Sequence, residues 1–185
     1  MKLLVQDAFI GYDVDKPLQK YVNFSVESGD VCCILGPNGC GKTTLVNTVL
    51  GMTPLLSGSI SLDGSDVTKW SAAELSDKVA FVSQRHNQPF PYQVKDVVML
   101  GRLSKTESLS GKPSTRDYNI VENAMEEMGI RHLRDVPYVD ISGGELQLVM
   151  FSRALAQEPQ LLIMDEPTAA LDLPKIGRAS CRERV

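Results

Sequence analysis

The chain has 185 residues, of which 43% are hydrophobic and 23% are charged, with 14 glycines, 10 prolines and 4 cysteines. This composition is typical of one globular domain with or without a small subdomain, and it excludes collagen-like, disordered and disulfide-scaffold chains. The formal net charge of −4 argues against a general nucleic-acid binder, which would carry a basic surface. No stretch reads as a membrane span or signal peptide, so we expect a cytoplasmic protein with no nucleic-acid partner.

Strands and helices are expected to alternate along the chain. Strands are expected at residues 3–10, 22–26, 31–35, 59–62, 78–83 and 161–164, and helices at 42–50, from 94 onward, at 120–128 and at 146–156. Val31–Leu35 is wholly apolar, which predicts a strand buried on both faces. Asp63-Gly64 predicts a tight turn after the fourth strand. Together these elements predict an α/β fold with a helical insertion between about residues 90 and 140.

A glycine-rich loop lies between a predicted strand and a predicted helix. It fits the pattern G-x-x-x-x-G-K-[ST], in which backbone N–H groups and the positive end of the following helix hold phosphate oxygens. Lys42 would place its ammonium on the β- and γ-phosphates, and Thr43 would offer its hydroxyl to Mg²⁺. A structural glycine turn does not explain this lysine and threonine in register. The residues expected here to bind ATP are Gly36, Pro37, Asn38, Gly39, Cys40, Gly41, Lys42, Thr43 and Thr44.

Two carboxylates follow the apolar run Leu161–Met164. A parallel strand buried in a sheet presents such residues at its carboxyl end, where ligand sites of α/β proteins form. Asp165 would then hold Mg²⁺, directly or through water, and Glu166 would act as the general base on the attacking water. An acidic pair at a strand end is weak evidence alone, but it is much stronger in a chain that also carries the phosphate loop.

Ser142-Gly143-Gly144-Glu145 precedes the last predicted helix. Read alone, it is a capping box in which Ser142 caps the helix and Glu145 completes the reciprocal hydrogen bond. Together with the phosphate loop and the acidic pair, it resembles the signature of the nucleotide-binding subunit of ABC transporters, Leu-Ser-Gly-Gly-Gln. The chain departs from that signature at both ends, with Ile141 and Glu145. The resemblance adds residues 142–145 to those expected to bind ATP.

The resemblance extends over residues 1–174 and implies a fold in more detail. It implies a P-loop NTPase core with a mostly parallel sheet, antiparallel N-terminal strands and an inserted helical subdomain. The core would comprise residues 1–88 and 141–174, and the helical subdomain residues 89–140, with the signature at 141–145. The activity implied is ATP hydrolysis with ATP and Mg²⁺.

Further site residues follow from the resemblance alone. Tyr12 matches the aromatic residue that stacks on adenine, and Gln84 matches the loop glutamine that senses Mg²⁺ and the γ-phosphate. Asp172 matches a loop that crosses the interface of a head-to-tail homodimer. In that dimer, Ser142 and Gly144 of one subunit contact the γ-phosphate held by the other. Without the resemblance, Tyr12 would be an ordinary half-buried tyrosine and Gln84 a surface glutamine.

The segment Gln84–Arg102 carries proline-flanked aromatic residues, Phe90 and Tyr92, ahead of a helix. The resemblance implies that this segment docks on an integral membrane permease, on the inner face of the membrane, with an extracytoplasmic substrate-binding protein acting indirectly. The string VVMLGR, with SGGE and ALAQEP, looks like the importer branch for iron chelates (siderophores, haem) and cobalamin. Zinc and manganese importers stay open as alternatives.

Two other function classes compete with import. A non-transport ABC ATPase of translation or DNA repair would usually carry two cassettes or a long coiled-coil insertion. A catalytically silent ATP binder would not need Glu166 and Lys42 together. The genes beside this one would separate transport from the first alternative.

The end of the chain departs from the rest. Ile176–Val185 is the translation of a common short-read sequencing adapter, so we expect the native sequence to end near Pro174 and residues 175–185 to be a non-native tail. The family places a switch histidine well beyond the catalytic glutamate, whereas only 19 residues follow Glu166 here. We therefore expect this chain to be a weak or inactive ATPase, and the complete subunit to be an active one.

Overall fold

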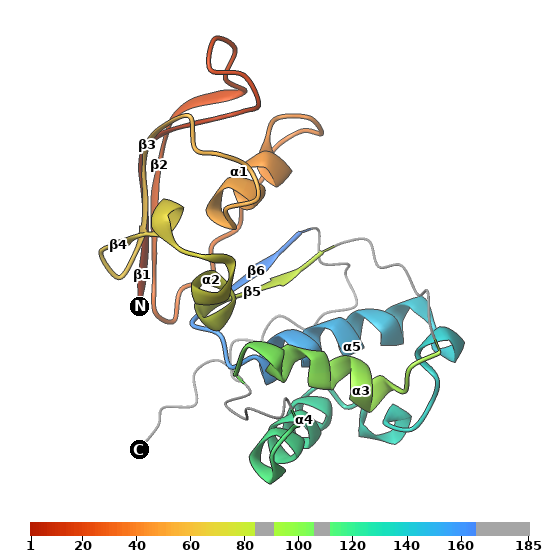
Figure 1. Cartoon of the computed structure of the whole chain (residues 1–185). Helices are drawn as coiled ribbons and strands as arrows, with labels where there is room; N and C mark the ends of the chain where they lie inside the picture. Colours follow the sequence, from red (N-terminus) through yellow and green to blue (C-terminus); the bar gives the residue numbers. More distant parts are fainter. Residues whose placement is uncertain (84–90, 106–111, 166–185) are drawn as a thin grey trace. The chain divides into compact units, whose positions relative to one another are not determined.

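The computed structural model describes residues 1–83, 91–105 and 112–165, which fall into two compact units with a boundary after Leu75 (Figure 1). That boundary lies within helix α2 (Ala72–Lys78). Each unit has its own set of buried apolar side chains. In the described part of the chain, no helix has both the length and the apolar character needed to cross a membrane.

The first unit contains an antiparallel sheet with the strand order β2-β1-β3-β4. Its strands are β1 (Lys2–Ile10), β2 (Gln19–Glu27), β3 (Ser57–Leu62) and β4 (Ser65–Asp66). Asp63 and Gly64 have φ values of 50° and 78° and form the two-residue connection between β3 and β4. The predicted tight turn is therefore confirmed, and positive φ at both positions is the backbone that this kind of hairpin needs.

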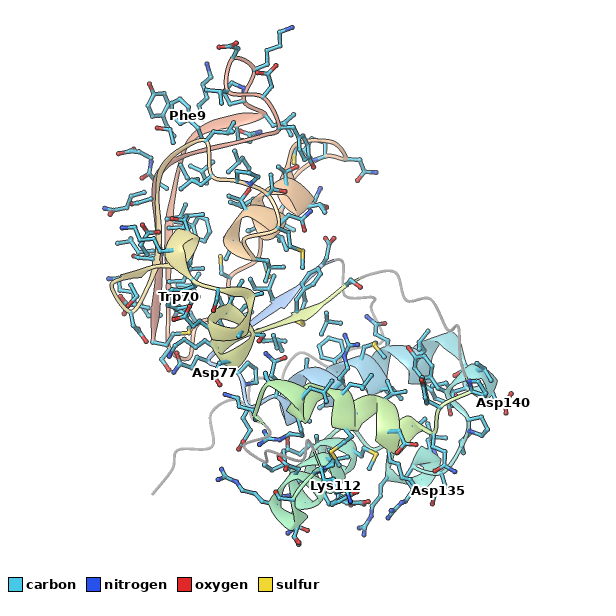
Figure 2. All side chains as sticks on the ribbon, in the orientation of Figure 1. Phe9, Trp70, Asp77, Lys112, Asp135 and Asp140 are labelled. Carbon is cyan, nitrogen blue, oxygen red and sulfur yellow. The ribbon has the colours of Figure 1, made fainter. Side chains whose placement is uncertain are left out.

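Strand β1 forms the centre of this sheet and buries alternate side chains. Leu3 and Val5 are buried, and after a register shift the buried positions continue with Ala8 and Ile10. The shift inserts an extra residue, which keeps the apolar side chains on the core face on both sides of the irregularity. On this strand, Phe9 (labelled in Figure 2) packs edge-on against Tyr21, with ring centroids 4.9 Å apart.

Helix α1 (Lys42–Val49) packs on β1 through its apolar side. Leu45 and Val49 are buried, and Gly51 at φ 67° follows the end of the helix. The predicted helix with its terminating glycine is confirmed, because glycine adopts this left-handed conformation without steric cost. A short 3₁₀ helix, η1 (Val67–Lys69), follows β4.

The prediction of a buried strand at Val31–Leu35 is wrong. The segment has no regular secondary structure, and Val31 and Leu35 are 71% and 90% exposed. An apolar run becomes a buried strand only when neighbouring strands supply hydrogen bonds on its edges. Among the described residues, no strand pairs with this segment, and β5 and β6 pair with each other.

The second unit combines a parallel strand pair with a helical bundle. Its strands are β5 (Val79–Val82) and β6 (Leu161–Met164), and its helices are α3 (Val94–Met99), α4 (Thr115–Glu127) and α5 (Gly143–Ala156). Three 3₁₀ helices complete it: η2 (Leu100–Lys105), η3 (Arg131–Leu133) and η4 (Tyr138–Asp140). Lys105 Nζ donates to Asp77 Oδ1 at 2.5 Å; Asp77 is labelled in Figure 2.

Helix α5 forms the core of this bundle, where α3, α4 and α5 lie side by side (Figure 1). Four consecutive residues of α5, 149–152, are buried, so the helix is covered on all sides at this level. Ser152 lies in this layer and donates to the carbonyl of Ala124 on α4 at 3.3 Å. The α/β class is thus confirmed, with antiparallel N-terminal strands and a parallel pair. The subdomain boundaries at 88/89 and 140/141 stay predictions.

Candidate functional site

The glycine-rich loop at residues 36–41 is exposed except at its end and leads directly into α1. Gly39 and Gly41 have φ values of 81° and 101°, which non-glycine residues rarely adopt. Gly41 is the N-cap of α1; it provides no side-chain cap, and the first turn contains no acidic residue. The positive end of the helix dipole is therefore not neutralised by a side chain of that turn, which suits the binding of an anion.

Lys42 closes this loop on itself. Its Nζ donates to the carbonyl oxygens of Gly36 at 2.7 Å and Pro37 at 3.0 Å. Both acceptors are neutral, and among the described residues Lys42 forms no ion pair with a carboxylate. The ammonium therefore lies at the mouth of the loop with its charge available to a phosphate.

Tyr12 reaches the same helix end from the connection between β1 and β2. Its hydroxyl lies 3.4 Å from Thr44 Oγ1, and either group could donate. The side chain is 74% exposed, whereas Thr44 is buried and Thr43 is exposed. The structure thus brings the predicted adenine-stacking residue to the first turn of the helix after the phosphate loop, with a ring face left accessible.

Gln19 is a contact of the loop that sequence reasoning missed. Its Nε2 donates to the carbonyl of Cys40 at 2.9 Å. A glutamine at the start of a strand carries no spacing signal, so only the tertiary contact identifies it. The other predicted loop residues, Asn38 and Pro37 among them, lie where the pattern places them, before α1.

The signature segment caps helix α5. Ser142 Oγ accepts from the Glu145 amide, and Glu145 Oε2 accepts from Ser142 N at 2.8 Å and Ser142 Oγ at 2.6 Å. These hydrogen bonds, the side-chain one first, hold the pKa of Glu145 below its usual value. The capping box that was the alternative interpretation is therefore present in the structure.

Gly143 and Gly144 have no structural explanation within the described chain. A Cβ at either position would meet nothing within 4 Å, and neither has a positive φ. Each glycine costs a helix about 1 kcal/mol relative to alanine. Two such residues in the first turn of α5 leave a smooth backbone surface, which suits the close approach of a group from outside this surface.

The acidic end of β6 is described up to Asp165. Its amide donates to the carbonyl of Val82 at 3.0 Å, so the parallel pairing of β5 and β6 extends to the residue that follows the strand. This confirms the predicted strand and places the half-buried Asp165 at its carboxyl end. Glu166, Gln84 and Asp172 lie outside the described residues. Residues 36–44 belong to the first unit and residues 142–145 and 165 to the second, and each set is described within its own unit.

The string at residues 97–102 is used for packing. Val97 and Val98 are buried on α3, and a Cβ on Gly101 would lie 2.2 Å from the carbonyl oxygen of Arg153. Arg102 is 4% exposed and donates to Asp117 Oδ1 at 2.9 Å, Ala156 O at 2.8 Å and Glu158 Oε2 at 3.0 Å. Packing inside the second unit therefore accounts for these side chains.

The oxygen donors that the sequence predicts for Mg²⁺ suit this ion if substrate phosphates supply its other ligands. In residues 1–83, 91–105 and 112–165, no group of three or more His, Cys, Asp or Glu side chains could hold a metal ion. Mg²⁺ is commonly held by one or two protein oxygens together with substrate phosphates. In the first unit, the Thr43 hydroxyl is an oxygen donor of that kind, and in the second unit the Asp165 carboxylate is another.

Known proteins of one family are similar to this chain in sequence and in fold. The family model described as ABC transporter matches residues 19–169. A solved ATP-binding cassette of an ABC transporter in its ADP conformation has a TM-score of 0.81 and 27% identity, covering 97% of this chain and 76% of that chain. The P-loop NTPase fold that the resemblance implied is therefore confirmed.

Curated relatives from bacteria are similar over most of the chain. An uncharacterized ABC transporter ATP-binding protein of Haemophilus influenzae is 41% identical over 93% of this chain and 65% of its own length. The molybdate import ATP-binding protein MolC of the same organism is 34% identical over 92% of this chain and 62% of its own length. The hemin import ATP-binding protein HmuV of Hahella chejuensis is 37% identical over 86% of this chain and 62% of its own length. The chain thus spans less than two thirds of the length of these relatives.

Proposed function

Since the chain belongs to the ABC transporter family, we propose that it is the ATP-binding and ATP-hydrolysing subunit of an importer. The observation that carries this proposal is the phosphate loop. Gly39 and Gly41 adopt left-handed backbone, the lysine ammonium is bound only to neutral carbonyls among the described residues, and the helix after the loop has no side-chain cap. Such a loop is built to hold a polyphosphate.

Each predicted residue has a role in this reaction. Tyr12 stacks on the adenine, and the loop at residues 36–44 holds the phosphates through its backbone N–H groups, which Pro37 lacks, and through the Lys42 ammonium. Thr43, Gln84 and Asp165 would hold Mg²⁺, which would supply positive charge against that of the phosphates. Glu166 accepts a proton from the water that attacks the γ-phosphorus, and ADP leaves with the electrons of the broken bond.

A head-to-tail homodimer would complete the site. Ser142–Glu145 of one subunit would approach the γ-phosphate held by the other, and Asp172 would lie in a loop that crosses this interface. The open surface at Gly143 and Gly144 supports this part of the proposal, because nothing in the described chain lies within 4 Å of where a Cβ would stand, which leaves room for an approaching phosphate.

The solute we propose is an iron chelate, either haem or a ferric siderophore. Relatives named for hemin import and for iron(3+)-hydroxamate import, at 37% and 34% identity, support this class. The relative named for molybdate import favours an oxyanion as the second candidate, ahead of cobalamin, zinc or manganese. The subunit would act on the inner face of the membrane, where residues 84–102 dock on the permease, and an extracytoplasmic binding protein would deliver the solute.

The hydrolysis is tested with Glu166→Gln in a subunit extended through the switch histidine. We expect ATP binding to be retained and phosphate release to slow by about a hundredfold or more, because the general base is lost. Glu126→Gln, an exposed carboxylate on α4, is the matched control and should hydrolyse at the parental rate. A Glu166→Gln subunit that turns over like the parent would remove Glu166 from the base role.

The solute is tested through the neighbouring genes. A many-helix permease and a secreted binding protein beside this gene predict import. The purified binding protein should then bind hemin or a ferric hydroxamate, and the bound ligand should quench the tryptophan fluorescence of the protein. Binding of molybdate alone would favour the second candidate. A gene neighbourhood without any permease would contradict the transport role.

A further inference from the structure

Gln19 is the first residue of β2, and its backbone is held firmly. The amide of Leu18, directly before it, donates to the carbonyl of Ile10 at 2.8 Å. Gly11 brings the two sides of this connection so close that a Cβ there would lie 2.9 Å from the Leu18 nitrogen. The connection between β1 and β2 is therefore closed tightly at its base, and the exposed Gln19 side chain starts from a fixed point.

From this point, the Gln19 side chain reaches the end of the phosphate loop. Its Nε2 donates to the carbonyl of Cys40 at 2.9 Å. A Cβ built on Gly41 would lie 3.5 Å from Gln19 Cγ, 3.8 Å from Ile10 Cδ1 and 3.9 Å from Leu18 Cβ. The side chain thus supplies a hydrogen bond to Cys40 and occupies the space beside Gly41 that a Cβ there would face.

The hydrogen bond to the Cys40 carbonyl also fixes the direction of the N–H in the same peptide. In a trans peptide the C=O and the N–H point in opposite directions, and the structure contains no cis peptide bond among its described residues. The Cys40 carbonyl and the Gly41 N–H belong to one such peptide. Holding the carbonyl toward Gln19 therefore directs the Gly41 N–H to the opposite side, at the position where the loop turns into α1.

We propose that Gln19 is a positioning residue of the nucleotide site, which sets the direction of a phosphate-binding amide through the carbonyl of the same peptide. This inference rests on the proposed function, because it requires that the loop binds a nucleotide. It assigns a role to a residue that belongs to neither the phosphate loop nor the signature. The contact lies wholly within the first unit, so binding to that unit reports on it.

The test measures the affinity of the chain for the fluorescent nucleotide mant-ATP. Gln19→Met keeps the length and the Cγ methylene and removes the donor, so we expect affinity to fall about threefold to tenfold, the effect of one lost hydrogen bond. Gln19→His restores an N–H donor at a similar distance and should recover most of the affinity. The thermal unfolding temperature without nucleotide should stay within error for both variants, since the bond is exposed.

Gln6→Met provides the matched control. Gln6 is an exposed glutamine on β1 of the same sheet, and the variant should bind mant-ATP like the parent chain. Equal affinities of the parent and Gln19→Met for mant-ATP would overturn the inference and leave the proposed function intact. The same holds if Gln19→His binds mant-ATP as weakly as Gln19→Met does. A parent chain that does not bind mant-ATP would contradict the proposed function itself.

Discussion

The N-termini of helices α1 and α4 differ in whether a side chain of the protein neutralises the positive end of the helix dipole. Helix α4 begins with a complete capping box, in which Ser114 N and Ser114 Oγ donate to Asp117 Oδ2 at 2.8 and 2.7 Å. Helix α1 begins at Gly41 with no side-chain cap and no acidic residue in its first turn. One helix dipole is neutralised within the chain, and the other is left for a ligand.

The capped end is also the more deeply packed one. Asp117 is 5% exposed and accepts from Arg102 as well as from Ser114. Arg102 in turn binds the last residue of α5, Ala156, and Glu158 after it. This network joins α4, η2 and the end of α5, so the capped N-terminus serves stability. The contrast indicates that the N-terminus of α1 is open to an anion, whereas that of α4 already holds the carboxylate of Asp117.

Of the changes at the capped end of α4, removing Arg102 should lower the free energy of unfolding most. Arg102→Met leaves Asp117 charged and buried and leaves the Ala156 carbonyl without its donor. We expect the free energy of unfolding to fall by about 3–5 kcal/mol, measured by urea denaturation. Arg116 is an exposed arginine on α4, and Arg116→Met should change the free energy of unfolding by less than about 0.5 kcal/mol. Equal effects of the two would show that the network does not stabilise the unit.

Removing Lys42 should affect binding rather than folding. Lys42→Ala removes the ammonium at the mouth of the phosphate loop, and a hydrogen bond to a charged group contributes about 1.5–3 kcal/mol. We expect the affinity for mant-ATP to fall about a hundredfold while the unfolding temperature stays unchanged. Lys20→Ala, on exposed β2, is the control. A large loss of stability in Lys42→Ala would break the contrast between the two helix ends.

Acid should weaken the α4 end specifically. Hydrogen bonds from Ser114, then the ion pair with Arg102, lower the pKa of Asp117 from 3.8 to about 2. A carboxylate with a lowered pKa contributes stability that is fully present above its unfolded pKa and is lost as pH falls toward the folded value. We expect up to about 2 kcal/mol to disappear between pH 4 and pH 2. The parent and Asp117→Asn should therefore differ most at neutral pH and converge near pH 2, as measured by urea denaturation.

The smallest effect should come from the signature glycines. Gly144→Ala adds a Cβ that meets nothing within 4 Å, so the variant should be more stable by about 0.5–1 kcal/mol. In the extended subunit the same change should lower ATP turnover, because the approach to the helix end is obstructed. Gly129→Ala, at φ 70°, should instead destabilise the chain. A destabilised Gly144→Ala would show that this glycine has a structural reason.

The sequence by itself determined the binding motifs and the helices and strand next to them. The glycine-lysine-threonine pattern predicted the loop before α1, and the apolar run at Leu161–Met164 predicted the strand that ends at Asp165. Ser142 and Glu145 predicted their own capping box. These features depend on neighbours within a few residues, where backbone geometry and side-chain spacing decide the outcome.

Only the tertiary structure decided which residues meet across longer separations. The amide of Gln19 reaches Cys40, the hydroxyl of Tyr12 reaches Thr44, and Arg102 is buried against Asp117. The exposed course of Val31–Leu35 belongs to the same class, because a strand requires pairing partners that the local sequence does not specify. Local spacing sets the period of an element, whereas the path of the folded chain chooses the groups that satisfy its polar and apolar surfaces.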